Sequence, residues 1–276
     1  MRARIRNETS YTFDPPAKFV IQTLRMTPRN HEGQHVISWR MDVDVDCRLK
    51  ASEDTFGNVT HTFSVDGPIA TMTIVAEGEV ETFDNAGIVR GAIERFPPEL
   101  YCRDTDHTLA SNELRAFALE CGRAAKGPLD CLHRLMDTLH ETLKIDPDAT
   151  GETPKTAAEA YGADKIAPTD ASHVFVSASR FLGHPSRVVE GYVLSPEGQP
   201  KSHSWAESFV EDLGWIGFDA SIGACPQESH VRVAIGLDRL GVAPVRFAQI
   251  GGQPPQVAIR LSGLPGSRRG QFQRQS

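Results

Sequence analysis

The period of the hydrophobic pattern changes near Pro97, and this change constrains the fold more than any other feature. From Met1 to about Glu81 apolar and polar residues alternate, most clearly over Ile37–Val45. The turn residues of Asp54–Asn58 separate two such runs. Alternation of period two with short turns is typical of antiparallel strands. We therefore predict an antiparallel β-sandwich in residues 1–95.

The second part of the chain shows helical spacing first and strand-like runs afterwards. Leu132, Leu135, Met136 and Leu139 fall on one face of a predicted helix, which indicates a buried side. Helices followed by antiparallel strands predict an α+β fold, with a core over residues 96–262 and a flexible tail over 263–276. The predicted helices are 112–122, 129–143, a short turn from Thr156, and 168–182. The predicted strands are 186–193, 204–210, 215–218, 231–234 and 257–261.

Charge and cysteine content exclude several classes of partner. The formal net charge is -7, and no dense basic run stands out before the tail, so we expect no nucleic-acid partner. The five cysteines include no C-x-x-C pair, which argues against a disulfide framework and a zinc knuckle. No window approaches the roughly 18 apolar residues of a membrane span. The charged start of the chain is unlike a secretory signal, so we predict no membrane contact and a cytoplasmic location.

Three groups of motifs carry a resemblance to a known family. One is His203-Ser-Trp-Ala-Glu207, followed by Gly214-Trp-Ile-Gly-Phe-Asp219. The second runs from Thr156-Ala-Ala-Glu to Leu182-Gly-His-Pro-Ser-Arg-Val-Val-Glu-Gly-Tyr192. The third is N-terminal and includes the turn at Asp54–Asn58. Together they resemble the papain-related transglutaminase-like superfamily, preceded by the β-rich module of its bacterial members.

The resemblance implies a Cys-His-Asp arrangement for acyl transfer at an amide. In such a site a cysteine at a helix N-terminus attacks, a histidine activates it, and an aspartate orients the histidine. By resemblance, His203 matches the histidine and Asp219 the aspartate. Taken singly, a histidine beside a tryptophan is usually a packing residue, and an aspartate closing a strand is usually a turn former. Their order and spacing together favour the catalytic positions.

The expected cysteine is missing. The family pattern Gly-x-Gly-Val-Cys-Gln-Asp aligns without gaps on the segment that ends at Asp170, and the nucleophile position falls on Pro168. Both glycines are replaced, by Asp164 and Ile166, and only Asp170 agrees with the pattern. A proline has neither a nucleophilic group nor an N–H for an oxyanion, although it suits the first turn of a helix.

Other residues near the implied cleft are weaker nucleophile candidates. Thr169 follows the nucleophile position and is more simply a residue of the first helical turn. Cys225 lies in the loop after Asp219, and an incidental small thiol is its simpler interpretation. With Trp205 and Asp170, these two residues are our candidates for lining the cleft. A metal site from His173, His203 and Asp219 lacks a close-spaced ligand pair, so we predict no metal and no cofactor.

These observations lead to one function hypothesis and two alternatives. The leading hypothesis is a catalytically degenerate transglutaminase-like protein that binds a peptide or protein partner in its cleft. The first alternative is an active amidase, peptidase or acyltransferase of the same fold with a relocated nucleophile. The second is a structural protein whose N-terminal sandwich is the contact surface. The sequence leaves open which of these applies.

Overall fold

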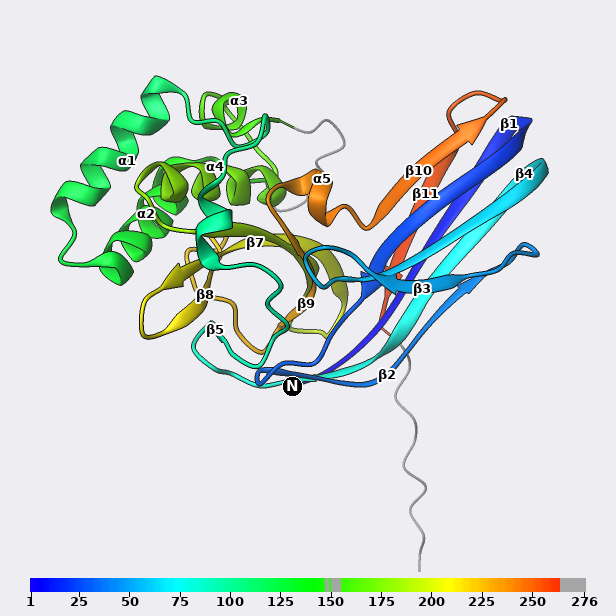
Figure 1. The fold of residues 1–276 in the computed structure, drawn as a ribbon, viewed down its shortest axis with the longest axis horizontal. Coiled ribbons are helices and arrows are strands. Elements are labelled where there is room, and N and C mark those ends of the chain that lie inside the picture. Colours follow the sequence, from blue (N-terminus) through cyan, green and yellow to red (C-terminus); the bar gives the residue numbers. More distant parts are fainter. Residues whose placement is uncertain (147–148, 150–154, 264–276) are drawn as a thin grey trace, which may run out of the picture.

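The computed structural model describes residues 1–146, 149 and 155–263. Residues 147–148, 150–154 and 264–276 lie outside the described part, and nearly all of the predicted tail falls there. The described residues form two antiparallel sheets and a group of helices (Figure 1). No helix in this described part is both long and apolar enough to span a bilayer.

The N-terminal sheet is built on two very long strands that pair with each other. These are β1 (Arg2–Thr27) and β4 (Val59–Thr82). Their register shifts between Thr12 and Phe19, beside the prolines of Asp14–Pro16 and Pro68. Proline has no N–H for the ladder, so these positions interrupt the pairing and let both strands bend. Figure 1 shows both strands running out to the tip of the sheet and back.

The bend turns one continuous sheet into two facing layers, which confirms the predicted sandwich. Tyr11 in the first half of β1 stacks on Phe247, which pairs with the second half, with ring centroids 5.9 Å apart. The layers enclose a core that includes Val20, Leu24 and Met72. Shorter strands complete the layers: β2 (Gln34–Val43), β3 (Lys50–Glu53), β10 (Val245–Ile250) and β11 (Gln256–Ser262).

The second sheet carries the helices on one face and contacts the sandwich on the other. Phe175 of the long helix α4 packs with Ala206 and Phe218 of this sheet in one core. On the sandwich side, Tyr192 and Val231 pack with Ile5 of β1. The sheet order is β5-β8-β7-β6-β9. Its strands are β5 (Ile88–Val89), β6 (Ser186–Leu194), β7 (Pro200–Val210), β8 (Gly214–Phe218) and β9 (His230–Gly236).

The four described helices between residues 112 and 181 agree with the predicted ones, whereas the two short helices at 98–102 and 239–242 were not predicted. Their bounds are η1 (Pro98–Cys102), α1 (Asn112–Ala124), α2 (Pro128–Thr142), α3 (Ala157–Tyr161), α4 (Pro168–Phe181) and α5 (Arg239–Val242). The short helix α3 begins with a capping box between Thr156 and Glu159. The predicted α+β class, with helices packed on an antiparallel sheet, is confirmed.

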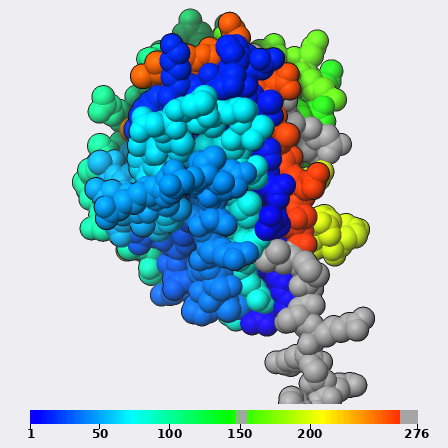
Figure 2. Space-filling model, turned by 90° about the vertical axis from the view of Figure 1, so that its right-hand side faces the viewer, coloured from blue at the N-terminus to red at the C-terminus, as the bar shows by residue number. Residues whose placement is uncertain are grey.

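The two sheets do not divide at residue 95. Strands β10 and β11 lie in the segment we assigned to the core, yet both pair with β1. Conversely, β5 lies before residue 95 and pairs with β8 of the second sheet. Figure 2 shows the outcome on one face, where blue and cyan N-terminal residues are bordered by orange C-terminal strands. The chain thus leaves the sandwich, builds the core and returns to close the sandwich.

Candidate active-site remnant

Pro168, the residue that we predicted at the nucleophile position, is the first residue of helix α4. The N-cap Ala167 makes no side-chain cap. A proline fits there because the first amide of a helix has no intrahelical partner in any case. Nearly all of α4 is buried, and its core face packs against β7. The helix therefore keeps its place on the sheet without a cysteine at its start.

The structure brings His203 and Asp219 together. His203 lies on β7, Asp219 follows the end of β8, and their Nε2 and Oδ2 atoms are 2.5 Å apart. The other carboxylate oxygen of Asp219 accepts hydrogen bonds from the Ser221 N–H, at 3.0 Å, and from its hydroxyl, at 2.6 Å. This is the arrangement that orients an imidazole in acyl-transfer sites.

Burial and hydrogen bonding oppose each other at this pair. Burial alone would raise the pKa of Asp219, but hydrogen bonds from His203, His230 and Ser221 hold it well below its usual range. Burial alone would lower the pKa of His203, yet the hydrogen bond and charge of Asp219 raise it. Asp219 is therefore ionised near neutral pH, and it favours a protonated His203.

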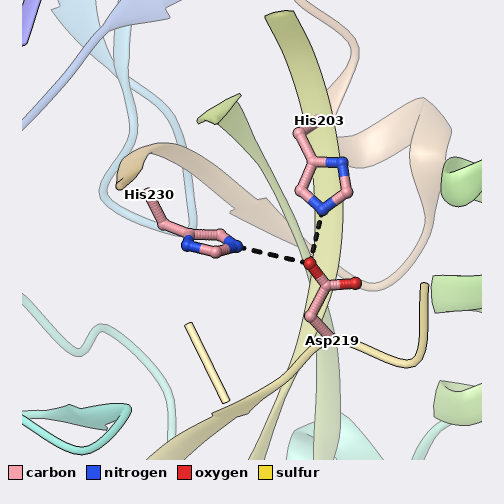
Figure 3. Close-up of side chains that lie close together, drawn as sticks. All are labelled: His203, Asp219 and His230. Carbon is pink, nitrogen blue, oxygen red and sulfur yellow. Dashed lines mark hydrogen bonds and ion pairs between the residues drawn. The ribbon is translucent and has the colours of Figure 1, made fainter. Parts of the chain in front are cut away.

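A second histidine, His230, contacts the same carboxylate, and we did not predict it. Its Nε2 lies 3.3 Å from Asp219 Oδ2, which it approaches from a different direction than His203 (Figure 3). Its Nδ1 accepts the backbone N–H of Gln227 at 3.2 Å, which assigns the ring proton to Nε2. Trp205 stacks on His203 and meets His230 edge-on. His230 lies one residue before a predicted strand, and nothing local in the sequence points to its role.

Sequence reasoning also missed a carboxyl group on β6, next to His203. Glu190 accepts a hydrogen bond from the hydroxyl of Ser204, its partner across the strands. Burial raises the pKa of Glu190 to about 7, and the hydrogen bond and the charges of His203 and Arg239 only partly oppose this. Glu190 thus changes its charge near neutral pH.

The first turn of α4 is linked to the same region through Arg239. Asp170 is 1% exposed, and its carboxylate lies 3.9 Å from Arg239 Nη1 and 4.0 Å from Lys155 Nζ. The backbone N–H of Arg239 also donates to Nε2 of His173 at 2.9 Å. His173, which we had considered as a metal ligand with His203 and Asp219, belongs to this separate cluster. Burial lowers its pKa to about 3.

Neither candidate for a relocated nucleophile has the surroundings of an activated group. Thr169 Oγ1 is buried and has no hydrogen-bond partner among the described residues. Burial, with the charge of Asp137, raises the pKa of the Cys225 thiol. Burial likewise raises the pKa of each of the other cysteines, Cys47, Cys102, Cys121 and Cys131. An activated thiol needs a lowered pKa, and none of the five has one.

Two family models match this chain. The bacterial transglutaminase-like N-terminal region matches residues 3–81, and the transglutaminase-like superfamily matches residues 115–220. Residues 115–220 are thus a transglutaminase-like core, preceded by the N-terminal region found in bacterial transglutaminase-like proteins. Both matches agree with the motifs described above, and the second spans the start of α4, His203 and Asp219.

Individual relatives are similar in sequence or in fold. The uncharacterized protein ML0607 of Mycobacterium leprae is 23% identical over 262 residues, which cover 89% of this chain and 92% of the relative. A crystal structure from Cytophaga hutchinsonii, provisionally named a cysteine protease, superposes with a TM-score of 0.75 at 15% identity, covering 97% and 92% of the two chains. The periplasmic domain of TgpA from Pseudomonas aeruginosa has a TM-score of 0.39 at 16% identity, covering 80% and 88%.

Proposed function

We propose that this protein has lost thiol-based acyl transfer and binds a peptide or a protein segment in the cleft beside α4. The observation that carries the proposal is Pro168 at the first position of α4, where the family pattern predicts the nucleophile, in a chain that still assembles the His203–Asp219 pair. A proline cannot form an acyl intermediate. The fold that would hold a substrate chain is nevertheless kept.

The raised pKa values of the cysteine thiols support the proposed loss of thiol-based acyl transfer. With every cysteine pKa raised, few thiolates are present at neutral pH, and thiolate is the nucleophilic form. The charged side chains near the start of α4 could supply polar contacts to a bound chain. Arg239 lies 3.9 Å from Asp170 in the first turn of α4, and its charge acts on Glu190 of β6; such groups fix the orientation of a bound chain.

Restoring the cysteine tests whether Pro168 occupies the nucleophile position. We expect Pro168→Cys to create a thiol that reacts with iodoacetamide at pH 6 roughly 10-fold or more faster than an ordinary cysteine, because His203 and the helix dipole favour its thiolate. Pro128→Cys is the matched control, since Pro128 is also the first residue of a helix, α2, but lies outside the segment on which the family pattern places the nucleophile. Equal rates for the two variants would show that the assigned position is wrong.

Retention of peptides tests the binding role. Immobilised protein would be exposed to a tryptic digest of cell proteins, and the retained peptides would be identified by mass spectrometry. We expect a defined set to be retained by the wild type, lost with Glu190→Gln and His203→Ala, and kept with the exposed-site control His35→Gln. Amide hydrolysis or transamidation by the wild type that disappears in His203→Ala would refute the proposal. Peptides that stay bound to both cleft variants would favour the sandwich as the contact surface.

A further inference from the structure

Three buried side chains direct nitrogen and oxygen atoms at one small space. His203 Nε2, Asp219 Oδ2 and His230 Nε2 lie within 4.8 Å of one another, and the residues are 6%, 1% and 7% exposed. They come from β7, from the end of β8 and from the start of β9 (Figure 3). We propose that these three atoms bind a zinc ion, Zn²⁺. This proposal does not depend on whether the cleft binds a peptide.

Two of the three ligand-atom distances can be compared with tetrahedral zinc, and the two histidine nitrogens lie within 4.8 Å of each other. Zinc bonds of about 2.0–2.1 Å to nitrogen and oxygen place neighbouring ligand atoms roughly 3.3 Å apart. His230 Nε2 and Asp219 Oδ2 are already 3.3 Å apart. His203 Nε2 is 2.5 Å from the same oxygen, so binding requires a displacement of about 0.8 Å at this ligand. Two imidazoles with one carboxylate form a ligand set that zinc takes in open, three-ligand sites.

Zinc binding releases the Nε2 proton of His203 to solvent and moves the ring proton of His230 from Nε2 to Nδ1. In the absence of metal, each Nε2–H donates to Asp219, and zinc needs both of these nitrogens bare. Each neutral ring then carries its proton on Nδ1. At His230, Nδ1 faces the Ser229 hydroxyl at 3.2 Å, and this oxygen can accept the relocated proton. The cost is the hydrogen bond from the Gln227 N–H, which is lost from Nδ1 when that atom carries the proton.

The surroundings hold the ligands in orientation. Ser221 donates twice to Oδ1 of Asp219, which leaves Oδ2 as the oxygen that faces the two histidines. Trp205 contacts both imidazole rings and fixes their planes. Partners of this kind orient metal ligands and contribute to metal affinity.

With a proline at position 168, His203 has no cysteine there with which to exchange a proton. A histidine that serves a cysteine nucleophile must exchange a proton with the thiol during each turnover. Pro168 takes no proton, so coordination of His203 conflicts with no such step. Among the described residues, no cysteine sulfur joins the group, and imidazole with carboxylate suits a borderline ion such as Zn²⁺.

Calorimetric titration of the full chain with zinc chloride tests the site. We expect one ion per chain for the wild type and for the control His35→Gln, which changes an exposed histidine on β2. His230→Gln removes a ligand and should weaken binding by more than about 100-fold, while Ser221→Ala should weaken it by about 10-fold or more. A wild type that binds no zinc, or a His230→Gln variant that binds as the wild type does, overturns the proposal.

If His230→Gln does not fold, the absorption spectrum of bound Co²⁺ tests the site without that variant. Circular dichroism would establish folding, and Co²⁺ would replace zinc in the wild type and in Ser221→Ala. A cobalt spectrum without a thiolate charge-transfer band, weakened in Ser221→Ala, supports the site. A thiolate band, or equal affinity in the two proteins, overturns it. Peptide retention is measured separately, so failure of zinc binding is distinguishable from failure of peptide binding.

Discussion

Asn58 and Ile235 exchange two hydrogen bonds across the contact between the sandwich and the second sheet. The Asn58 side-chain amide donates to the Ile235 carbonyl at 2.8 Å, and its oxygen accepts the Ile235 N–H at 2.8 Å. Gln34 makes the same pair of bonds with Arg232, which lies earlier on β9. Strand β9 is at the edge of its sheet, so two side chains satisfy its backbone where no neighbouring strand does.

Removing the Asn58 amide should destabilise the protein markedly. Asn58→Ala leaves a buried N–H and a buried carbonyl of Ile235 unpaired, which costs roughly 1–3 kcal/mol for each group. Urea unfolding followed by circular dichroism measures the loss. The control is Asn30→Ala, which removes one exposed hydrogen bond to Val36 and should cost less than about 1 kcal/mol. Similar losses for both variants would contradict the buried role of Asn58.

Glu190 should make stability fall as the pH rises toward neutrality. Its folded pKa of about 7 lies above the ordinary glutamate value, so its contribution is fully present below about pH 4.5 and is lost as the pH rises through 7. The Gln side chain in Glu190→Gln stays neutral, so the variant does not lose this stability as the pH rises. We expect the stability of the wild type relative to the variant to drop by about 2–3 kcal/mol between pH 4.5 and 7.5. Parallel pH profiles for the two proteins would rule out the raised pKa.

A buried ion cluster at Glu207 should be essential for folding. Glu207 is 1% exposed and lies 2.7 Å from both Arg187 Nε and Arg232 Nε; burial alone would raise its pKa, but the two arginines lower it to about 2. Glu207→Gln leaves the buried Arg187 with Glu94 as its counter-charge and removes the carboxylate that pairs with Arg232, and breaking such a buried pair costs about 3–5 kcal/mol. The exposed pair of Asp130 and Arg134 is the control, and Asp130→Asn should cost less than about 1 kcal/mol.

The sign of the pH dependence at Glu207 is opposite to that at Glu190. Because its folded pKa is depressed, its contribution is present above about pH 4.5 and is lost as the pH falls through 2. Acid unfolding midpoints of the wild type and Glu207→Gln check this. If the two proteins lost stability in parallel between pH 4.5 and 2, the ion cluster would not be the cause.

The native cysteines should react slowly and independently of His203. Burial raises the pKa of each thiol, including Cys225, so the thiolate fraction at pH 7 is small. Mass spectrometry after timed iodoacetamide treatment of the native protein locates the adducts. We expect scattered, slow labelling that is the same in His203→Ala. Fast labelling at one cysteine that His203→Ala abolishes would instead identify a relocated nucleophile.

Local pattern was sufficient to predict much of this protein. The period-two alternation of the N-terminal residues, the apolar stripe of α2 and the proline at the start of α4 act over a few neighbouring residues, so they can be read along the chain. The motifs around His203 and Asp219 indicated the family and a pair of residues that the structure brings within hydrogen-bond distance. The run Val245–Ile250 alternates only over its first three residues, and we did not predict β10.

Tertiary structure decided which distant segments meet. The return of β10 and β11 to β1 joins the two ends of the chain, and periodicity carries no information about the partner of a strand. His230 reaches Asp219, and Glu190 acquires its raised pKa, only because several strands bury them together. The contact of His230 with Asp219 and the raised pKa of Glu190 therefore depend on burial and on proximity in the folded structure. The sequence by itself determined the elements and the proline at the first position of α4, while packing determined the charge and the contacts of the residues around Asp219.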